Sequence, residues 1–189
     1  MSAPHTDQAN SLHADAVRVL STWQPPTPEQ ATLRQTYLDH LAARPDGMWR
    51  ACRPAHLTAG MVVVDPTAEH VLLVLHGRIH RWVQPGGHCE EGDVSLAATA
   101  TREAVEETGV ADLRVSELPL RLSRHGAPCL AETHLDVQYL GVAPHDATPV
   151  VSAESADVRW FGVHELPRDI ASGVADSVAA ARRAVSALA

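Results

Sequence analysis

Runs of apolar residues along the chain predict several buried strands. Residues 61–64 are continuously apolar and mostly β-branched, which predicts a buried strand over 58–64. A second apolar run predicts a strand at 71–75, and the alternating pattern of 134–142 predicts another. Shorter extended segments are predicted at 81–83, at 157–161, and within 113–122 with a break at Pro119.

Helical spacing of apolar residues predicts four helices, at 11–23, 28–44, 95–108 and 172–188. Thr27 has the pattern of an N-cap, with Pro28 at the first helical position and Gln30 three residues after the cap. Gly109 is placed to end the helix at 95–108. We expect the polar residues 1–10 to fray and residues 124–130 to form a loop.

These elements do not alternate as regular strand–helix–strand units. They predict an α/β fold in which helices pack against a mixed sheet. We place a helical extension at residues 1–50 and the main domain at residues 51–189.

Composition narrows the class of protein. The 189 residues carry a net charge of −8, which argues against a nucleic-acid polymer as partner. Three cysteines make an odd count without paired spacing, so a disulfide framework is not expected and a reducing cytoplasm fits better. No signal peptide or membrane-spanning run is visible. The sequence leaves open whether two copies form a homodimer.

The chemistry concentrates in residues 86–110, which we expect to begin as a glycine-rich turn, with positive φ allowed at Gly86 and Gly87, and to continue as a helix with many acidic residues. Helical spacing puts Glu103, Glu106 and Glu107 on one face, where the three carboxylates repel one another. A bound divalent cation would relieve this repulsion, and oxygen ligands favour Mg²⁺ or Mn²⁺. Arg102 is placed to orient a carboxylate. With the helix N-terminus offering N–H groups to an anion, this pattern indicates hydrolysis of a diphosphate.

The same segment resembles the signature of the Nudix hydrolases. Residues 102–110, Arg-Glu-Ala-Val-Glu-Glu-Thr-Gly-Val, match its second half position by position. The first half differs: Asp93 stands where the family has Glu, and eight residues rather than seven separate it from Arg102. The resemblance implies a Nudix-like α/β/α sandwich with a mixed sheet, extending over about residues 57–170.

The resemblance also implies roles for individual residues. Glu103, Glu106, Glu107 and the carbonyl of Gly87 would be metal ligands, and Arg102 would orient a glutamate. The general base varies in the family, so Glu103, Glu154 and Asp136 are all candidates. The implied activity is hydrolysis of a nucleoside diphosphate linked to another moiety, with Mg²⁺ or Mn²⁺ as cofactor and the small-molecule nucleotide as partner.

Other residues are candidates for contact with the substrate. Arg78, Arg81 and His88 could bind phosphate, although each is also common on a solvated surface. Trp82 could stack on a base, although a tryptophan in a strand more often packs in a core. A zinc site is also conceivable, because Cys52, Cys89 and Cys129 each have a histidine within four residues. Twelve histidines make such neighbours frequent by chance, and no Cys-x-x-Cys pair is present.

Two other functions stay open. An isoprenoid diphosphate isomerase and a non-catalytic nucleotide sensor would both share the fold. The complete set of carboxylates after Arg102 favours hydrolysis over both.

Overall fold

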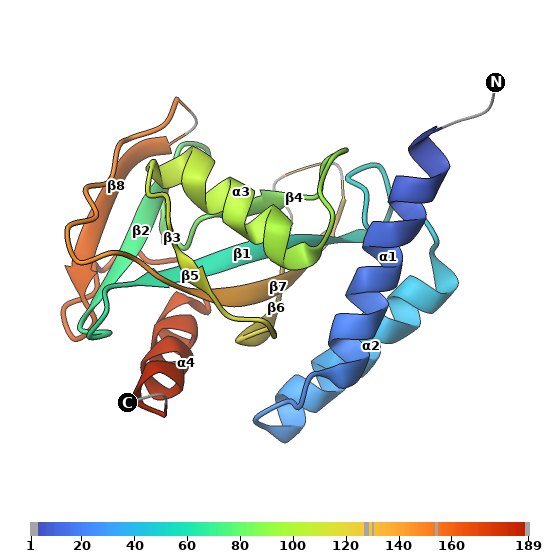
Figure 1. The fold of residues 1–189 in the computed structure, drawn as a ribbon, viewed down its shortest axis with the longest axis horizontal. Coiled ribbons are helices and arrows are strands. Elements are labelled where there is room, and N and C mark those ends of the chain that lie inside the picture. Colours follow the sequence, from blue (N-terminus) through green and yellow to red (C-terminus); the bar gives the residue numbers. More distant parts are fainter. Residues whose placement is uncertain (1–3, 127–128, 130, 154, 188–189) are drawn as a thin grey trace.

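The computed structural model describes residues 4–126, 129, 131–153 and 155–187 of the chain (Figure 1). The helices in these residues are α1 (Pro4–Thr22), α2 (Pro28–Ala43), α3 (Leu96–Thr108) and α4 (Val174–Ser186). The strands are β1 (Ala55–Val64), β2 (His70–His76), β3 (Trp82–Val83), β4 (Gly86–His88), β5 (Arg114–Val115), β6 (Arg121–Gly126), β7 (Thr133–Val142) and β8 (Ser155–Gly162).

The strands form one mixed sheet around β1, as the sequence predicts. β1 pairs in parallel with β7 along ten residues, and it pairs in antiparallel fashion with β2 and with β4. The remaining strands extend this arrangement: β3 and β8 pair with β2, while β5 and β6 pair with β7. The longest strands lie at the centre and carry the buried apolar runs, so the hydrophobic pattern and the pairing agree.

The two faces of the sheet carry different helices. Residues Ala59, Met61 and Val63 of β1 point into a core that also contains apolar residues of α1, α2 and α3. Val62 and Val64 alternate to the opposite face and pack in a second core with residues of α4. Figure 1 shows α3 and α4 on opposite sides of the sheet, which is the expected α/β/α sandwich.

The N-terminal helices are joined to the sheet by buried polar contacts. The Gln30 side chain donates to the carbonyl of Leu122 at 3.0 Å and accepts from the Leu122 N–H at 2.7 Å. The Tyr37 hydroxyl donates to the carbonyl of Ser123 at 2.8 Å. Gln30 therefore supplies hydrogen-bond partners to the backbone N–H and carbonyl of Leu122 on the edge of β6 that faces away from β7. Residues 1–50, expected as an extension, share their core with α3 and β1.

Three local expectations need correction. The first helix begins at Pro4 rather than near residue 11, because Pro4 suits a first turn and no Pro or Gly follows until residue 25. Thr27 does cap α2, but Gln30 reaches across to β6 instead of closing a capping box. Strand β6 continues to Gly126, into the expected loop, because its pairing with β7 continues that far.

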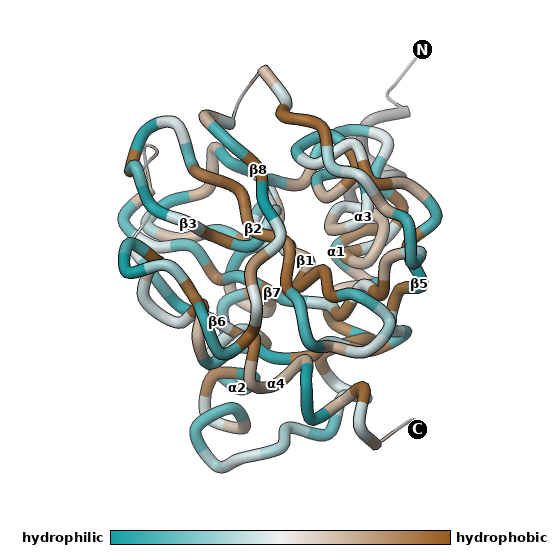
Figure 2. The backbone as a smooth tube through the Cα atoms, turned by 90° about the vertical axis from the view of Figure 1, so that its left-hand side faces the viewer, coloured by the Kyte–Doolittle hydropathy of each residue, from teal (hydrophilic) through white to brown (hydrophobic). Residues whose placement is uncertain are grey.

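Hydropathy along the chain follows this architecture. Figure 2 shows hydrophobic segments along the central strands and hydrophilic ones in many of the connections. Within the described residues, no helix combines the length and the apolar character that crossing a membrane requires.

Candidate active site

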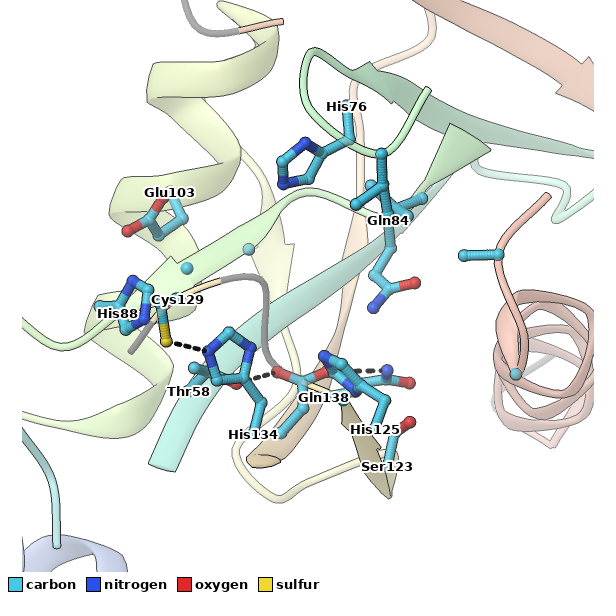
Figure 3. A pocket seen from close by; sticks show the side chains of 18 of the residues that line it. Thr58, His76, Gln84, His88, Glu103, Ser123, His125, Cys129, His134 and Gln138 are labelled. Carbon is cyan, nitrogen blue, oxygen red and sulfur yellow. Dashed lines mark hydrogen bonds between the residues drawn. The ribbon is translucent and has the colours of Figure 1, made fainter. Parts of the chain in front are cut away.

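A pocket of about 940 Å³ opens beside β4, against the face of the sheet that carries α4 (Figure 3). Its walls include Gly86 and Gly87 of β4 and two glutamates of α3, Glu103 and Glu107. Polar residues of β1 and β7 form another part of its lining. The pocket therefore lies between the acidic helix and polar positions of the sheet.

Gly86 and Gly87 lie in a short strand rather than in a turn with positive φ, which corrects one expectation. A Cβ atom on Gly86 would lie 2.7 Å from the Gly60 Cα and 2.9 Å from the carbonyl oxygen of Ala59. A Cβ atom on Gly87 would overlap the carboxylate of Glu103. Close approach of neighbouring groups is thus the reason that both positions need glycine.

Helix α3 holds its glutamates against this glycine strand. Ser95 caps its start by accepting from the Ala98 N–H at 3.1 Å, and Gly109 ends it in the left-handed region at φ 68°. The Gly86 N–H donates to the Glu107 carboxylate at 2.9 Å. Because the caps fix where the helix begins and ends, Glu103 and Glu107 project toward β4 one turn apart.

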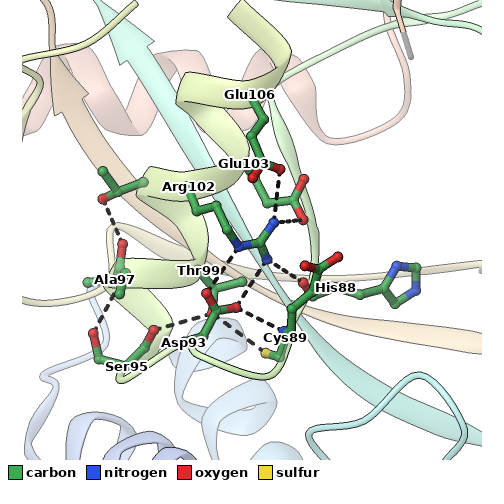
Figure 4. Close-up of polar contacts among 12 residues, drawn as sticks. His88, Cys89, Asp93, Ser95, Ala97, Thr99, Arg102, Glu103 and Glu106 are labelled. Atoms are coloured by element: carbon green, nitrogen blue, oxygen red, sulfur yellow. Dashed lines mark hydrogen bonds and ion pairs between the residues drawn. The ribbon is translucent and has the colours of Figure 1, made fainter. Parts of the chain in front are cut away.

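Arg102 lies at the centre of the acidic cluster (Figure 4). One guanidinium nitrogen, Nη1, donates to Glu103 and to Glu106, both at 3.0 Å. The other, Nη2, donates to the carbonyl of His88 at 2.9 Å. Arg102 thereby connects two of the three glutamates to each other and to the end of β4.

The Glu103 carboxyl group has a perturbed acidity. Its pKa is raised to about 7, chiefly by burial and less strongly by the neighbouring charges of Glu106 and Glu90, while Arg102 opposes the shift. The Glu103 side chain is only 13% exposed, compared with 58% for Glu106. Such a carboxylate gains most from a nearby positive charge, which a divalent cation would supply.

Asp93 holds Arg102 from the other side. The Nε and Nη2 atoms of Arg102 donate to the two carboxylate oxygens of Asp93, both at 3.0 Å. Asp93 also accepts from the Thr99 hydroxyl and from the Glu90 N–H, both at 2.9 Å. Asp93 therefore reaches Arg102 with eight residues between them, from a position just before the helix cap Ser95.

The start of α3 is not open to an anion, contrary to expectation. Asp15 of α1 accepts from the Leu96 N–H at 3.0 Å, and Ser95 accepts from the Ala98 N–H. Side-chain oxygens thus occupy two of the first N–H groups of the helix. The carboxylates near the pocket lie further along α3.

Only some of the residues expected to contact substrate line the pocket. Arg78 and His88 line the pocket, whereas Arg81 is exposed and is not among its lining residues. Trp82 packs edge-on against Phe161 with ring centroids 4.7 Å apart, within the core on the α4 side. Glu154, a candidate general base, lies outside the described residues.

Asp136 lies on β7 within the pocket, and it is only 4% exposed. It accepts from the Thr58 hydroxyl and from the Gln138 amide, both at 2.9 Å. Sequence reasoning singled out Asp136 but missed Thr58 and Gln138, which line the same pocket. The signal for both was a polar side chain at an alternate position of an otherwise apolar strand.

Histidines gather at one side of the pocket. His56, His88 and His134 lie with ring centroids 5.1 Å apart in each pair, and the Cys129 thiol lies beside them. Burial lowers the pKa of His88 to about 4 and that of His134 to about 3. Cys52 and Cys89 are buried elsewhere, so only one of the three thiols joins the histidines.

Comparison with known proteins gives a consistent picture. The family model described as NUDIX domain matches residues 54–183. None of the curated proteins compared with the chain matches it.

Similar solved structures come from several organisms. The NUDIX domain of Shewanella oneidensis NrtR, complexed with ADP ribose, is 24% identical, with a TM-score of 0.57 over 72% of this chain and 92% of that one. An Ap4A hydrolase of C. elegans is 17% identical, with a TM-score of 0.58 over 69% of this chain and 98% of that one. A MutT/nudix family protein of Enterococcus faecalis is 18% identical, with a TM-score of 0.55 over 88% of this chain and 76% of that one. At these identities the likeness concerns the fold.

Proposed function

The chain belongs to the Nudix family, and from this premise we propose that it hydrolyses the phosphoanhydride bond of a nucleoside diphosphate linked to another moiety. The observation that carries the proposal is the cluster of Glu103, Glu106 and Glu107 around Arg102 at the edge of the pocket. Acidic side chains held this close, with one of them mostly buried, fit a site that works with a cation.

The donors of this cluster fit Mg²⁺ or Mn²⁺. All three side chains offer carboxylate oxygens, the ligand type that hard divalent ions prefer. Burial raises the pKa of Glu103 to about 7, and a bound cation beside it would favour its ionised form. Glu103, Glu106 and Glu107 would hold the ion, with the Gly87 carbonyl as a further ligand. A bound ion would offset the charge of the diphosphate and activate water for attack on phosphorus.

The surrounding residues keep the carboxylates in place. Asp93 receives two parallel hydrogen bonds from Arg102, and this bidentate geometry fixes the plane of the guanidinium group. The Nη1 atom of Arg102 then donates to both Glu103 and Glu106, which holds the two carboxylates close together. Preorganisation of this kind spares the site from rearranging when charge develops during reaction.

Asp136 is a candidate for the general base, alongside Glu103 and Glu154. Its carboxylate is fixed by hydrogen bonds from Thr58 and Gln138 within the pocket. A fixed carboxylate lining the pocket is suited to accept a proton from water. Asp136→Asn should then lower turnover and change its pH profile, whereas a purely structural Asp136 would alter stability alone.

The chemical class of the substrate follows from the pocket and from relatives. Arg78, His76 and Gln84 line the pocket on the side of β2 and β3 and offer hydrogen-bonding groups to a nucleotide. Among similar structures, one NUDIX domain is complexed with ADP ribose, and another protein is an Ap4A hydrolase. In both compounds adenosine carries phosphates that are joined to one another by phosphoanhydride bonds, so adenosine diphosphate derivatives belong first in a substrate panel.

The test is turnover of a panel of nucleoside diphosphate derivatives with Mg²⁺ or Mn²⁺. We expect Glu107→Gln to lower kcat at least about 100-fold, because a metal ligand is lost. Glu117→Gln, which changes an exposed glutamate outside the pocket, is the matched control and should keep full activity. Undiminished hydrolysis by Glu107→Gln would refute the proposal. Nucleotide binding without turnover would indicate a sensor, and rearrangement without hydrolysis would indicate an isomerase.

A further inference from the structure

Four side chains with nitrogen or sulfur donors converge next to the pocket, apart from the carboxylates of α3. We propose that they bind a zinc-type transition-metal ion; the four are His56, His88, Cys129 and His134. Their potential ligand atoms all lie within 4.8 Å of one another. The inference does not depend on the hydrolase proposal, because it concerns different donors and a different class of ion.

Strand register brings the three histidines together. The parallel pairing of β1 with β7 sets His56 directly beside His134. The antiparallel pairing of β1 with β4 sets His88 opposite Thr58, two residues along β1 from His56. Because alternate residues of a strand share a face, all three rings project from the same side of the sheet. Central strands fix these positions, so the cluster does not depend on a chance surface contact.

Cys129 completes the set from the connection between β6 and β7. Its Sγ atom lies 3.3 Å from Nε2 of His134 and 3.8 Å from Nε2 of His56. A tetrahedral zinc ion with ordinary bond lengths separates its nitrogen and sulfur ligands by about 3.3–3.7 Å. The two sulfur–nitrogen distances already lie close to this range, and a separation of 4.8 Å needs to close by about 1–1.5 Å.

The hydrogen bonds of the histidines leave lone pairs for a metal. His56 Nδ1 lies 3.1 Å from the carbonyl oxygen of Cys52, and a carbonyl can only accept, so Nδ1 carries the proton. Nε2 of His56 therefore presents its lone pair toward Cys129. This backbone contact is the outer-shell support that metal-binding histidines usually have.

His88 supplies an independent indication. Its Nε2 atom is buried, and no hydrogen-bond partner for it exists within the described part of the chain. A buried polar atom without a partner is costly and calls for an explanation. Ligation of an ion would satisfy it.

The donor set selects the ion. Imidazole and thiolate ligands favour zinc over Mg²⁺, whereas the carboxylates of α3 favour the reverse. Four protein ligands leave no open coordination position, which is typical of a structural zinc. Such an ion would fasten the segment carrying Cys129 to β1, β4 and β7 beside the pocket.

The first test measures zinc content in the full-length protein without a polyhistidine tag. After dialysis against metal-free buffer, mass spectrometry of the wild-type protein should find about one zinc ion per chain. Cys129→Ala and His134→Ala should lower zinc affinity at least about tenfold in competition with a chelating dye. Cys52→Ala and His125→Asn are the matched controls: Cys52 is a thiol outside the four, and the His125 ring lies 5.4 Å from that of His134 without belonging to the four. Both variants should retain zinc. Glu107→Gln should retain it as well.

The second test identifies the ligands in unaltered protein, so it does not depend on a variant that folds. Co²⁺ bound in place of zinc should show the absorption of a tetrahedral complex together with a sulfur-to-cobalt charge-transfer band. Loss of that band in Cys129→Ala would support the site further. If wild-type protein takes up no zinc from zinc sulfate, or if Cys129→Ala binds zinc as tightly as wild type, the proposal is wrong. A cobalt spectrum without sulfur ligation would overturn it too.

Discussion

Replacing Asp93 with alanine tests how the arginine of the acidic cluster is held. Asp93 is 6% exposed and accepts four hydrogen bonds, two of them from Arg102. Removing one partner of a buried ion pair typically costs about 3–5 kcal/mol. The Arg102 side chain is 22% exposed and keeps its contacts with Glu103 and Glu106, so we reduce the expected loss to about 2–4 kcal/mol.

A surface pair of the same geometry provides the control. Arg44 donates to Asp46 through Nε and Nη2 at 3.0 and 2.9 Å, but the Asp46 side chain is 52% exposed. Exposed pairs contribute about 0–1 kcal/mol, so Asp46→Ala should cost less than about 1 kcal/mol. Both variants remove a bidentate contact with an arginine, and Asp93 differs from Asp46 in its burial and in its further hydrogen bonds from Glu90 and Thr99.

Urea unfolding followed by tryptophan fluorescence, in buffer with EDTA, measures both losses. For a chain of this length, a loss of 2–4 kcal/mol corresponds to a decrease in Tm of about 4–16 °C. If Asp93→Ala and Asp46→Ala destabilise the protein equally, or if Asp93→Ala costs less than about 1 kcal/mol, then Asp93 does not anchor Arg102 in the way we describe.

The difference in unfolding free energy between wild type and Asp93→Ala should also depend on pH. Burial by itself raises the pKa of Asp93, but hydrogen bonds from Arg102, the Glu90 N–H and Thr99 outweigh it and bring the pKa below 3.8. A carboxyl group with a lowered folded-state pKa stabilises the protein above its unfolded pKa, and this contribution is lost as pH falls through the folded pKa. The difference between wild type and Asp93→Ala should therefore be constant from about pH 5 to 7 and shrink below about pH 4. A difference that stays constant into acid would indicate lost packing rather than lost charge.

Three further outcomes are expected. Gly86→Ala should lower Tm because its methyl group meets the backbone of β1. Gly87→Ala should lower turnover with a smaller loss of Tm, because its methyl group meets the end of the Glu103 side chain rather than backbone; equal losses of Tm would contradict this. In EDTA-treated native protein at pH 8, iodoacetamide should leave Cys89 unmodified, because burial raises the pKa of this thiol to about 12. Cys129, which lines the pocket, should react, and peptide mass spectrometry distinguishes the two modification sites. Gln30→Ala should cost about 2–4 kcal/mol in urea unfolding, because it leaves an N–H and a carbonyl of β6 without partners, and a cost below about 0.5 kcal/mol would contradict this.

Local signals account for the parts of the structure that sequence predicted well. The start and end of α3 follow from Ser95 and Gly109, whose capping roles depend on their immediate neighbours. Between those caps, spacing alone sets Arg102 beside Glu106 on the helix surface. The mixed sheet was predictable for a similar reason, since buried strands such as 61–64 are continuous apolar runs.

Contacts between distant segments account for what the sequence did not reveal. Leu96 is capped by Asp15, which lies 81 positions earlier, and Gln30 reaches Leu122 across 92 positions. Neither contact leaves a periodic pattern in the sequence. The histidine cluster depends on strand register in the same way: the pairing that sets His56 beside His134 is a property of the assembled sheet.

The role of Asp93 was predictable from the sequence only in part. The sequence marked it as a departure from the family pattern, with a shorter side chain and one extra residue before Arg102. The sequence placed the extra residue at the entry to the helix but left the role of Asp93 open, and the structure shows its carboxylate bound to the guanidinium group of Arg102. A change of spacing within a loop is tolerated when both ends are fixed by other contacts.

Phosphorus NMR of the reaction in ¹⁸O-labelled water tests the central claim most directly. Wild-type protein with Mg²⁺ or Mn²⁺ and an adenosine diphosphate derivative should produce two phosphorylated products, one of them carrying ¹⁸O on the phosphorus that water attacked. Glu107→Gln should form neither at a comparable rate. If wild type forms no new phosphorus species from any member of the panel, or forms products without label, the protein is not the metal-dependent diphosphate hydrolase that we propose.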